Sequence, residues 1–306
     1  MRVGILGAGR WGQALGRLAI AAGNKPLLAY RERRPPHILP STPHAEEVSE
    51  TCELLIVATS AAQVRSAIGL AKPTGHNRVV VAGRGVDPQS GEWLTDVVLD
   101  SCDSLRVGAL AGPAPVDEIL NGGLCAGVVA SAYDEVRQLT TAALHSSRYR
   151  VYESTDLAGV QVAGAAVPVL AMLVGLATRL GGAGVGLHAL VVARGIEEMA
   201  RLTRALGGKG ATMAGLAGLG DLVAVQGVAS HPYHQAGANL AAPDSARSDA
   251  LGAGPLHLAR ALLSQAARVQ VELPLTEALV AIAAGKIDPL EAVGNLMTRD
   301  AVSETN

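Results

Sequence analysis

Hydrophobic positions follow two different patterns in the two halves of the chain. In the first half, short aliphatic runs alternate with longer stretches in which apolar residues recur every three or four positions. A nearly continuous aliphatic run is typical of a strand buried on both faces, and the longer repeat is typical of a helix. The runs predict strands at residues 2–6, 26–30, 54–58, 79–82, 107–110, 127–131 and 148–153, with helices such as 12–22 and 61–71 between them.

The second half has a helical pattern almost throughout. After Asp156 the repeat predicts helices at 157–180, 186–206, 211–217, 254–268, 274–284 and 289–297, with a small, polar loop at 241–254. Alternation of strands and helices in the first half implies a parallel sheet with right-handed crossovers. We therefore expect an α/β domain with a parallel sheet over residues 1–155, followed by an all-α domain over residues 156–306.

One segment is long enough to cross a bilayer. Residues 157–178 contain no charged side chain over 22 positions, and about 20 apolar residues suffice to span a membrane. Gln161, Pro168 and many alanines and glycines keep the hydrophobicity modest, and no basic cluster flanks the segment. We therefore expect a buried helix of a soluble domain, with no membrane contact.

The charge balance argues against a nucleic-acid-binding protein. The 306 residues include 25 Lys and Arg against 27 Asp and Glu, for a formal net charge of −2, whereas nucleic-acid-binding domains usually carry a basic excess. Aromatic residues make up 2% of the chain and phenylalanine is absent. Base stacking therefore has few candidates, and the core must be aliphatic.

The cysteines favour a reducing compartment. Cys52, Cys102 and Cys125 are odd in number and include no CxxC pair. Such a set is typical of free thiols, and it predicts neither a disulfide framework nor a zinc site. We therefore expect a cytoplasmic protein without a metal centre.

A glycine-rich turn lies at the first predicted strand-to-helix junction. The chain there reads Gly7-Ala8-Gly9-Arg10-Trp11-Gly12, a GxGxxG motif directly after a strand and at the start of a helix. In such a motif the first glycine allows a tight turn, the second lets the backbone approach a pyrophosphate, and the third lets helix and strand pack closely. The helix N-terminus adds free N–H groups and the positive end of its dipole. The motif therefore predicts that these residues bind a dinucleotide in a Rossmann-type domain.

The end of the second predicted strand bears on the choice between NAD and NADP. A carboxylate there suits the ribose 2′-hydroxyl of NAD, and a guanidinium suits the 2′-phosphate of NADP. The sequence offers both, because residues 31–34 read Arg-Glu-Arg-Arg. Glu32 lies 20 residues after Gly12, as an NAD site requires, whereas the arginines favour NADP slightly. We predict NADP or NAD as cofactor, with Arg31 as a candidate contact.

Blocks of sequence spread over the chain point to a known family. After the opening Gly7-Ala8-Gly9-x-Trp11-Gly12 come Val151-Tyr152-x-Ser154-Thr155-Asp156-x-x-Gly159-Val160, Ala193-Arg194-Gly195-x-x-Glu198-Met199, Gly215-Leu216-Ala217-Gly218-Leu219-Gly220-Asp221-Leu222, Val271-Glu272-Leu273-Pro274-Leu275 and Leu296-Met297-x-Arg299. Together, and in this order, they resemble the NAD(P)-dependent glycerol-3-phosphate dehydrogenase family. The resemblance implies a Rossmann-type domain and a helical substrate domain, in a fold like that of 6-phosphogluconate dehydrogenase. It also implies a homodimer formed through the helical domain.

The resemblance implies an enzyme that reduces dihydroxyacetone phosphate to glycerol 3-phosphate with NAD(P)H. In the family a protonated lysine polarises the carbonyl oxygen and supplies the proton, a carboxylate orients that lysine, and an arginine with backbone amides holds the substrate phosphate. Such a cation stabilises the alkoxide that develops on the carbonyl oxygen. By position, the cofactor would lie beside Arg84 and Ala126. The substrate would lie beside Gly112 and Ala114, with Asp221 as the carboxylate.

The substrate end departs from the family pattern. Where the family reads Ala-Leu-Lys-Asn-Val and places its catalytic lysine, this chain reads Ala165-Ala166-Val167-Pro168-Val169. Valine donates neither a proton nor a charge. The family's Ser-Arg-Asn-Arg block, which binds substrate phosphate and cofactor, appears as Ser230-His231-Pro232-Tyr233-His234, and its Val-Val-Glu-Gly block is replaced within 249–255. The cofactor end changes less: Lys-Gly becomes Arg84-Gly85, and Ser-Gly-Pro-Ser becomes Ala111-Gly112-Pro113-Ala114.

Another side chain would have to replace the missing lysine. Lys209 is a weak candidate, because it lies in a glycine-rich loop at a position that varies in the family. His188, which stands where the family has the arginine of its Asn-x-Arg run, is another candidate, as are the histidines at 231 and 234, because imidazole as a side-chain type titrates near neutrality. We name His188 and Asp221 as candidate catalytic residues, with Asp221 orienting a histidine. The alternatives are that 231–234 form a polar surface loop, and that Asp221 caps a helix beginning after Gly220.

Two functional hypotheses follow from this mixture. The first is a divergent dehydrogenase of this family that still transfers hydride to a small carbonyl compound, either dihydroxyacetone phosphate or a different one, because the glycine turn and the block at 215–222 are retained. The second is a catalytically inactive relative that binds a nucleotide as a sensor or interaction protein, because the lysine, the asparagine and the arginine are lost together. Function depends on the site and not on the fold alone, so the geometry of the site is needed to decide between the two hypotheses.

Overall fold

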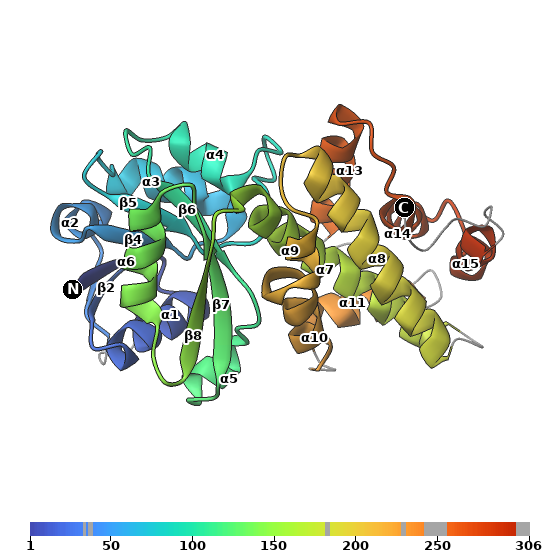
Figure 1. Ribbon diagram of the computed structural model, residues 1–306, viewed down its shortest axis with the longest axis horizontal. Helices are drawn as coiled ribbons and strands as arrows, with labels where there is room; N and C mark the ends of the chain where they lie inside the picture. The colour runs from blue at the N-terminus through green and yellow to red at the C-terminus, as the bar shows by residue number, and fades with distance from the viewer. Residues whose placement is uncertain (33–34, 36–38, 181–183, 228–230, 242–255, 298–306) are drawn as a thin grey trace.

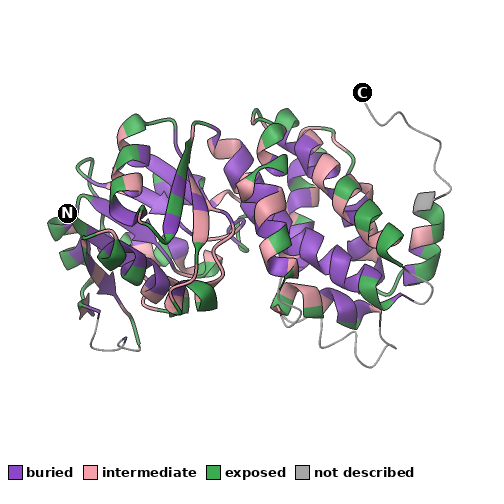
Figure 2. Cartoon of the chain, turned by 60° about the horizontal axis from the view of Figure 1, so that its bottom comes forward, coloured by how far each residue is buried: buried purple, intermediate pink, exposed green. Residues whose placement is uncertain are grey.

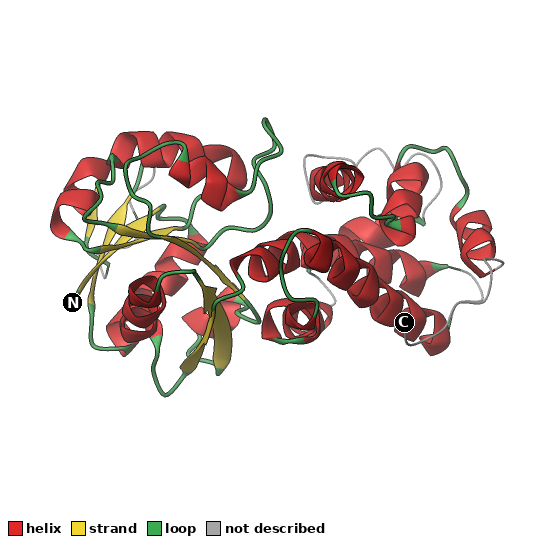
Figure 3. Cartoon of the chain, turned by 45° about the horizontal axis from the view of Figure 1, so that its top comes forward, coloured by secondary structure: helices red, strands yellow, loops and turns green. Residues whose placement is uncertain are grey.

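Two lobes lie side by side along the long axis of the molecule (Figure 1). The computed structural model describes residues 1–32, 35, 39–180, 184–227, 231–241 and 256–297. Within these residues every strand lies in the N-terminal lobe, and the C-terminal lobe is built from helices alone (Figure 3). The predicted α/β domain followed by an all-α domain is therefore confirmed.

An eight-stranded sheet runs through the N-terminal lobe. Its strands are β1 (Arg2–Leu6), β2 (Lys25–Ala29), β3 (Ser41–Thr42), β4 (Leu54–Val57), β5 (Arg78–Val81), β6 (Val107–Ala111), β7 (Cys125–Ala130) and β8 (Tyr149–Ser154), in the order β3-β2-β1-β4-β5-β6-β7-β8. Along β4, Leu54 and Ile56 pack into one hydrophobic cluster, and Leu55 and Val57 pack into another. Both faces of the sheet are therefore buried, as the unbroken aliphatic runs predict.

The expected parallel arrangement is wrong at one pair of strands. β6 and β7 pair antiparallel, with Leu110 opposite Val129, whereas the other neighbouring strands pair parallel. The connection between them contains α5 (Val116–Leu120), a helix of 5 residues. At about 1.5 Å per residue this helix spans roughly 7.5 Å, too little to cross back over a strand of about 17 Å. The chain therefore re-enters the sheet from the end at which it left. The two-residue strand β3 lacks an aliphatic run and is absent from the predicted set.

Helices cover both faces of the sheet. One face carries α1 (Arg10–Ala21), α5 and α6 (Asp134–Leu144), and the other carries α2 (Ala45–Thr51), a 3-10 turn (Ala61–Gln63), α3 (Val64–Ala71) and α4 (Leu94–Leu99). The carboxyl ends of β1, β4, β5 and β6 meet at one edge of the sheet. Ligands of open α/β sheets bind in the crevice outside that edge, and here the edge faces the helical lobe.

The helical lobe is built around α7 (Leu157–Arg179). The other described helices of this lobe are α8 (Val185–Ala205), α9 (Ala211–Ala214), a π-helical turn (Leu216–Gly220), α10 (Asp221–Gln226), α11 (Pro232–Leu240), α13 (Leu256–Arg268), α14 (Pro274–Ala283) and α15 (Pro289–Met297). α7 is buried on all sides from Val162 to Ala177, whereas the outer helices expose one face (Figure 2). A helix that is apolar all round is expected to be enclosed in this way. α7 is long and apolar enough to span a bilayer, but 83% of an apolar 18-residue stretch of this helix is buried inside the protein, as predicted for a core helix.

The two lobes share one hydrophobic cluster. Val86, Ala109 and Ala130 of the α/β lobe belong to the same buried cluster as the core of the helical lobe. At the same junction Gly85, with a φ of +92°, packs so closely against α13 that a Cβ would stand 2.2 Å from Leu258 Cδ2. The lobes are therefore held in a defined relation, and the crevice between them has fixed walls.

The helical lobe corrects two local predictions. The helix predicted at 211–217 ends at Ala214 and is followed by a π-helical turn. Gly218 permits this turn, because a Cβ there would lie 2.2 Å from the carbonyl oxygen of Met213. The predicted surface loop at 231–234 is also wrong, because Pro232 opens α11 after the N-cap residue His231. Residues 249–255 and most of the predicted loop at 241–254 lie outside the described residues.

Candidate active site

The glycine turn has the geometry that its motif predicts. Gly7 adopts a φ of +113°, which side chains other than hydrogen rarely allow. At Gly12 a Cβ would lie 1.9 Å from the carbonyl oxygen of Gly7, so only glycine lets α1 approach the turn. At Gly9 a Cβ would meet no atom within 4 Å, which leaves open space directly outside the turn. Ala8 completes the turn, and its carbonyl oxygen accepts a hydrogen bond of 2.9 Å from Gln13 Nε2.

The open space outside Gly9 suits an anion. Gly9 is the N-cap residue of α1, no side chain caps the helix, and its first turn contains no acidic residue. The free N–H groups and the positive end of the helix dipole therefore face the crevice. Nearby, Thr59 Oγ1 is buried and has no hydrogen-bond partner among the described residues. An uncapped helix end and an orphaned hydroxyl in the same crevice fit a bound dinucleotide.

A cleft of about 830 Å³ lies between the two lobes. The α/β lobe contributes the glycine turn, the loops after β4, β5 and β6, and the start of α5, and the helical lobe contributes α10, α11 and α13. The lining residues used below are Gly9, Arg10, Trp11, Thr59, Arg84, Ala111, Gly112, Ala114, Asp117, Glu118, Tyr149, Asp221, Ala224, Val225, His231, Pro232, Tyr233 and Leu258. The cleft is thus bounded by the predicted cofactor turn on one side and by the helical lobe on the other.

Arg84 and Asp221 meet across the cleft from opposite lobes. Arg84 Nη2 donates to Asp221 Oδ1 at 2.9 Å, and Nη1 donates to the other carboxylate oxygen. Asp221 is 2% exposed and Arg84 is 33% exposed. Burial disfavours the charged guanidinium, but the charge and hydrogen bonds of Asp221 outweigh it and raise the pKa of Arg84. The cleft therefore holds a permanently charged arginine, fixed by a carboxylate from the helical lobe.

Asp221 has a different partner from the one predicted. It pairs with Arg84 and not with a histidine. The alternative reading as a helix cap is also wrong, because α10 begins at Asp221 itself and the N-cap position belongs to Gly220.

His231 is the imidazole that reaches the cleft from α11. Its Nδ1 accepts a hydrogen bond of 3.3 Å from the backbone N–H of Tyr233, so a neutral ring carries its proton on Nε2. Burial, followed by the nearby charge of Arg84, lowers the pKa of His231 below its ordinary value of 6.5. At neutral pH this side chain is therefore an uncharged N–H donor.

Tyr149 is a cleft residue that the sequence analysis did not single out. It is 1% exposed and lines the cleft from the start of β8. Burial, with the nearby Cys125 and Asp221, raises the pKa of Tyr149, so the phenol keeps its proton. The sequence signal for its burial is the alternation of buried and exposed side chains along the start of β8, whose first residue, Tyr149, is on the buried face. That pattern predicts burial but does not reveal that the hydroxyl borders a cleft.

The predicted cofactor and substrate residues are partly brought together. Gly9, Arg10, Trp11, Arg84, Gly112 and Ala114 all line the cleft, and Trp11 Nε1 donates to the carbonyl oxygen of Ala82 at 2.7 Å. Arg31 lies beyond the end of β2, where its exposed side chain pairs with Glu32 at 2.8 Å. Ala126 lies on β7 and donates its N–H to Pro113 at 3.3 Å, outside the cleft lining. Arg33 and Arg34 lie outside the described residues.

The other predicted acid–base candidates lie away from the cleft lining. His188 Nε2 contacts Gln226 Oε1 at 3.1 Å, on the side of α10 that faces α8. Lys209 contributes its backbone N–H to Asp156 Oδ2 at 3.0 Å. Among the residues that the structure describes, no lysine lines the cleft. Arg84 is therefore the cation that stands beside the substrate end.

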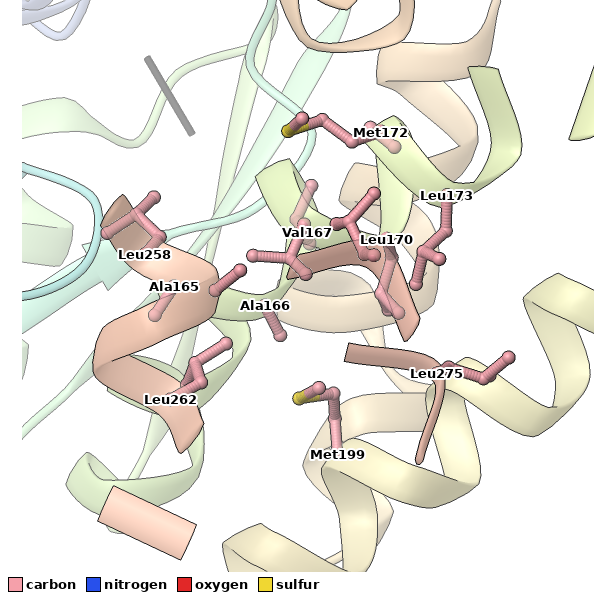
Figure 4. Packing of buried hydrophobic residues seen from close by; sticks show 14 of the residues in the cluster. Ala165, Ala166, Val167, Leu170, Met172, Leu173, Met199, Leu258, Leu262 and Leu275 are labelled. Atoms are coloured by element: carbon pink, nitrogen blue, oxygen red, sulfur yellow. The ribbon is translucent and has the colours of Figure 1, made fainter. Parts of the chain in front are cut away.

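Val167, which the family resemblance places at the position of the catalytic lysine, is sealed in the core. Its exposure is 0%, and it belongs to the cluster around α7. Figure 4 shows Val167 among the aliphatic side chains Ala166, Leu170 and Leu258. Pro168 follows it inside the helix and is buried as well. This part of α7 therefore packs the helical lobe and presents no polar group to the cleft.

The whole chain resembles one group of dehydrogenases. A family model described as the NAD-dependent glycerol-3-phosphate dehydrogenase C-terminus matches residues 156–294, and the corresponding N-terminus model matches residues 32–137. The chain is 31% identical over 326 residues to glycerol-3-phosphate dehydrogenase (NAD(P)+) of Bradyrhizobium diazoefficiens, across 99% of this chain and 98% of that relative. It is 33% identical over 341 residues to the enzyme of the same name from Ralstonia nicotianae, across 100% and 99%. The crystal structure of glycerol-3-phosphate dehydrogenase from Coxiella burnetii matches with a TM-score of 0.86 and 25% identity, across 97% of this chain and 99% of that one.

Proposed function

Because this chain belongs to the NAD-dependent glycerol-3-phosphate dehydrogenase family, we propose that it transfers hydride between NAD(P)H and a small carbonyl compound in the cleft between its lobes. One observation carries the proposal: the uncapped N-terminus of α1 and the fixed Arg84 line the same cleft. The first suits a pyrophosphate, and the second suits the oxygen of a carbonyl group that gains negative charge.

The chain's own residues hold the cofactor at one end of the cleft. Gly7, Gly9 and Gly12 open the turn to a pyrophosphate, and Thr59 Oγ1 offers a hydrogen bond. Arg31 favours NADPH through the 2′-phosphate, and Glu32 favours NADH through the 2′-hydroxyl. Both side chains are exposed, and within the described part of the chain they pair with each other, so a phosphate can compete for Arg31. NADPH is therefore the cofactor that we expect to bind more tightly.

At the other end, Arg84 and His231 are the groups that receive the carbonyl oxygen. A guanidinium has five N–H donors, and Asp221 takes two of those of Arg84. The remaining donors, with the Nε2–H of His231, can bind an oxygen in the cleft and stabilise its developing charge. Bound NAD(P)H supplies the hydride. Neither Arg84 nor neutral His231 gives up a proton readily, so the proton that completes the alcohol comes from solvent in the open cleft.

The test measures cofactor binding and turnover separately. Trp11 lies in the cleft, so its emission reports NADPH or NADH as the cofactor is titrated. Oxidation of the bound cofactor is then followed at 340 nm with a panel of small ketones and aldehydes. We expect saturable binding and measurable turnover, with Arg84→Ala reducing kcat by about 100-fold, as for loss of a preorganised oxyanion donor. Tight binding without any turnover on the panel would refute hydride transfer.

A second candidate function has its own supporting observation. Val167 is fully buried where the family's reacting lysine would stand, and no described residue returns an ammonium to the cleft. A nucleotide-binding sensor or interaction protein without turnover would need no such group. It predicts tight NADPH binding with no NADPH oxidation by any carbonyl compound of the panel, in the wild type as in Arg84→Ala. The hydride-transfer proposal instead ties both residues of the Arg84–Asp221 pair to the rate.

A further inference from the structure

The charges that line the described part of the cleft are negative or already paired. They are Arg10, Arg84, Asp117, Glu118 and Asp221. With His231 and His257, which also line the cleft, counted as neutral, their formal sum is −1, because two guanidiniums face three carboxylates. Arg10 pairs with Asp117, and Arg84 pairs with Asp221. An anionic substrate therefore meets no uncompensated cation in this part of the cleft.

The two arginines differ in how easily they can be released. Arg10 and Asp117 are 69% and 77% exposed, so Arg10 can turn to another anion at the cofactor turn. Asp221 is 2% exposed and held by the backbone of α10. If Arg84 turned towards a different anion, it would leave Asp221 charged, buried and unpaired, which is strongly unfavourable. Arg84 can thus hydrogen-bond a substrate oxygen, but it cannot lend the site a net positive charge.

Helix N-termini do not compensate for this at the substrate end. α10 continues directly from the π-helical turn before it, because Gly220 already has helical backbone angles, so α10 has no open N-terminus for an anion. α11 starts with Pro232, which has no N–H, and the N–H of Tyr233 is taken by His231 Nδ1. The start of α1 at Gly9 has neither obstruction. The cleft therefore offers an open helix end to the cofactor and blocked helix ends to the substrate.

The rest of the described lining at the substrate end is mostly apolar. Ala224, Val225, Pro232 and Leu258 line it from the helical lobe together with the polar Tyr233 and His257, and Ala114 lies on the opposite wall. Such a wall favours an alkyl group and adds no formal positive charge for a phosphate. Shape and charge thus point to the same class of ligand.

We infer that, if the proposed hydride transfer occurs in this cleft, its substrate is an uncharged ketone or aldehyde and not a phosphate ester. In this reaction hydride adds to the carbonyl carbon while the π electrons of the C=O bond move to oxygen, which then takes one proton from solvent. NAD(P)H is oxidised to NAD(P)+, and the carbonyl compound is reduced to the alcohol. A phosphate monoester would bring about −1.5 to −2 charges into a cleft whose described lining already sums to −1.

The first arm of the test compares two substrates that differ by the phosphate. Initial rates are measured with saturating NADPH for hydroxyacetone and for dihydroxyacetone phosphate. We expect kcat/KM to be at least 10-fold higher for hydroxyacetone. An equal or higher kcat/KM for dihydroxyacetone phosphate would overturn the inference.

The second arm measures binding and does not depend on turnover. Glycerol 3-phosphate and glycerol are titrated by calorimetry into the full chain loaded with NADP+. We expect glycerol 3-phosphate to bind the wild type no more tightly than glycerol does. Asp221→Asn, which frees the charge of Arg84, should bind glycerol 3-phosphate at least 10-fold more tightly, and salt should weaken this binding. Glu197→Gln is the matched control, because it frees Arg204 from an ion pair outside the cleft.

A second variant guards against loss of folding in Asp221→Asn. His231→Arg adds a guanidinium to the same wall, and it should raise affinity for glycerol 3-phosphate in the same direction. Tight, salt-sensitive binding of glycerol 3-phosphate to the wild type would overturn the inference, as would unchanged affinity in both variants. If NADPH binds but neither substrate is reduced, the proposed function fails, and this binding arm still decides the question of charge.

Discussion

Glycine at position 9 is required for cofactor binding and not for the backbone conformation. It is the N-cap residue of α1 with a φ of −67° and a ψ of −178°, a conformation open to any residue. Its missing Cβ leaves free space outside the turn, so glycine is required there by a ligand and not by the backbone. Gly7 and Gly12 differ, because φ and a close backbone contact fix them.

Gly9→Asp should therefore uncouple stability from binding. Aspartate is a favoured N-cap residue and adds about 0.5–1 kcal/mol through its hydrogen bond and the helix dipole. Its carboxylate also takes the place of the pyrophosphate, so we expect the Kd for NADPH to rise at least 100-fold, roughly 2.7 kcal/mol. Urea unfolding and Trp11 fluorescence measure the two quantities. Gly184→Asp is the control, because Gly184 caps α8 in the same way outside the cleft. An unchanged Kd in Gly9→Asp would place the cofactor elsewhere.

Arg84→Met should destabilise the protein through its partner. The substitution leaves the carboxylate of Asp221 buried without a counter-charge, which costs about 3 kcal/mol. Arg84→Lys keeps the charge but loses the two-point contact, so we expect a smaller loss of about 1 kcal/mol. The double variant Arg84→Met with Asp221→Asn should recover most of the loss in urea unfolding. A loss below 1 kcal/mol in Arg84→Met would show that Asp221 finds another partner.

Single residues also show where sequence reasoning reaches its limit. The glycine turn was predictable because GxGxxG specifies backbone geometry, and Gly7 and Gly12 have that geometry. The pairing of Arg84 with Asp221 was not, because 137 positions separate them and the contact exists only when the lobes meet. The position of Tyr149 in the cleft could not be predicted for the same reason. Its strand was predicted, but the cleft beside it forms only when both lobes pack together.

At the scale of elements, Glu198 ties α8 to the start of α14. Its carboxylate accepts hydrogen bonds from Leu275 N at 2.8 Å, Thr276 N at 3.1 Å and Thr276 Oγ1 at 2.7 Å. A side chain from one helix thus caps another whose own N-terminus, at Pro274, has no side-chain cap. Glu198→Ala should cost about 2 kcal/mol, because buried N–H groups lose their acceptor.

The same carboxyl group gives stability a defined pH dependence. Burial raises the pKa of Glu198 above its ordinary value of 4.5, although the hydrogen bonds oppose this shift. The folded state therefore binds the proton more tightly than the unfolded state. Its contribution to the free energy of unfolding is full below pH 4.5 and is lost as pH rises through the raised pKa. Glu198→Gln should lack this decline, which urea unfolding between pH 4 and pH 8 will measure. A parallel decline in both proteins would assign the effect to another group.

Elements were predicted well where their own residues decide the structure. α7 was identified from its uncharged length, and Pro274 and Pro289 mark helix starts that the structure shows. Predictions of elements failed where the structure depends on contacts or connections outside the element itself. The direction of β7 depends on the short α5, and α11 begins in a polar stretch that reads as a loop until Pro232 is recognised as a first-turn residue.

At the scale of the molecule, the open glycine turn and the buried Val167 belong to different lobes. The α/β lobe carries the turn, and the helical lobe carries Val167, which the family resemblance places at the position of the catalytic lysine. Our proposal therefore needs cofactor binding to persist in the α/β lobe while the substrate contacts of the helical lobe differ. The homodimer stays a prediction that follows from the family resemblance, and the cytoplasmic location stays a prediction that follows from the cysteines.

The shared core predicts that both lobes unfold together. Val86, Ala109 and Ala130 join the cluster built on α7, so the α/β lobe loses buried surface when the helical lobe opens. The two tryptophans report this, because Trp11 packs in the α/β cluster and Trp93 packs against the cluster of the helical lobe. Trp11→Phe and Trp93→Phe should therefore give coincident urea transitions. NADPH at 100 times its Kd should add about 2.7 kcal/mol to the free energy of unfolding that Trp11 reports in the Trp93→Phe variant. If the Trp11→Phe variant still binds NADPH, Trp93 should report the same increase there. Because Trp93 belongs to the α/β lobe and packs against the shared cluster, separate midpoints would mean that the junction between the lobes opens before the α/β core unfolds.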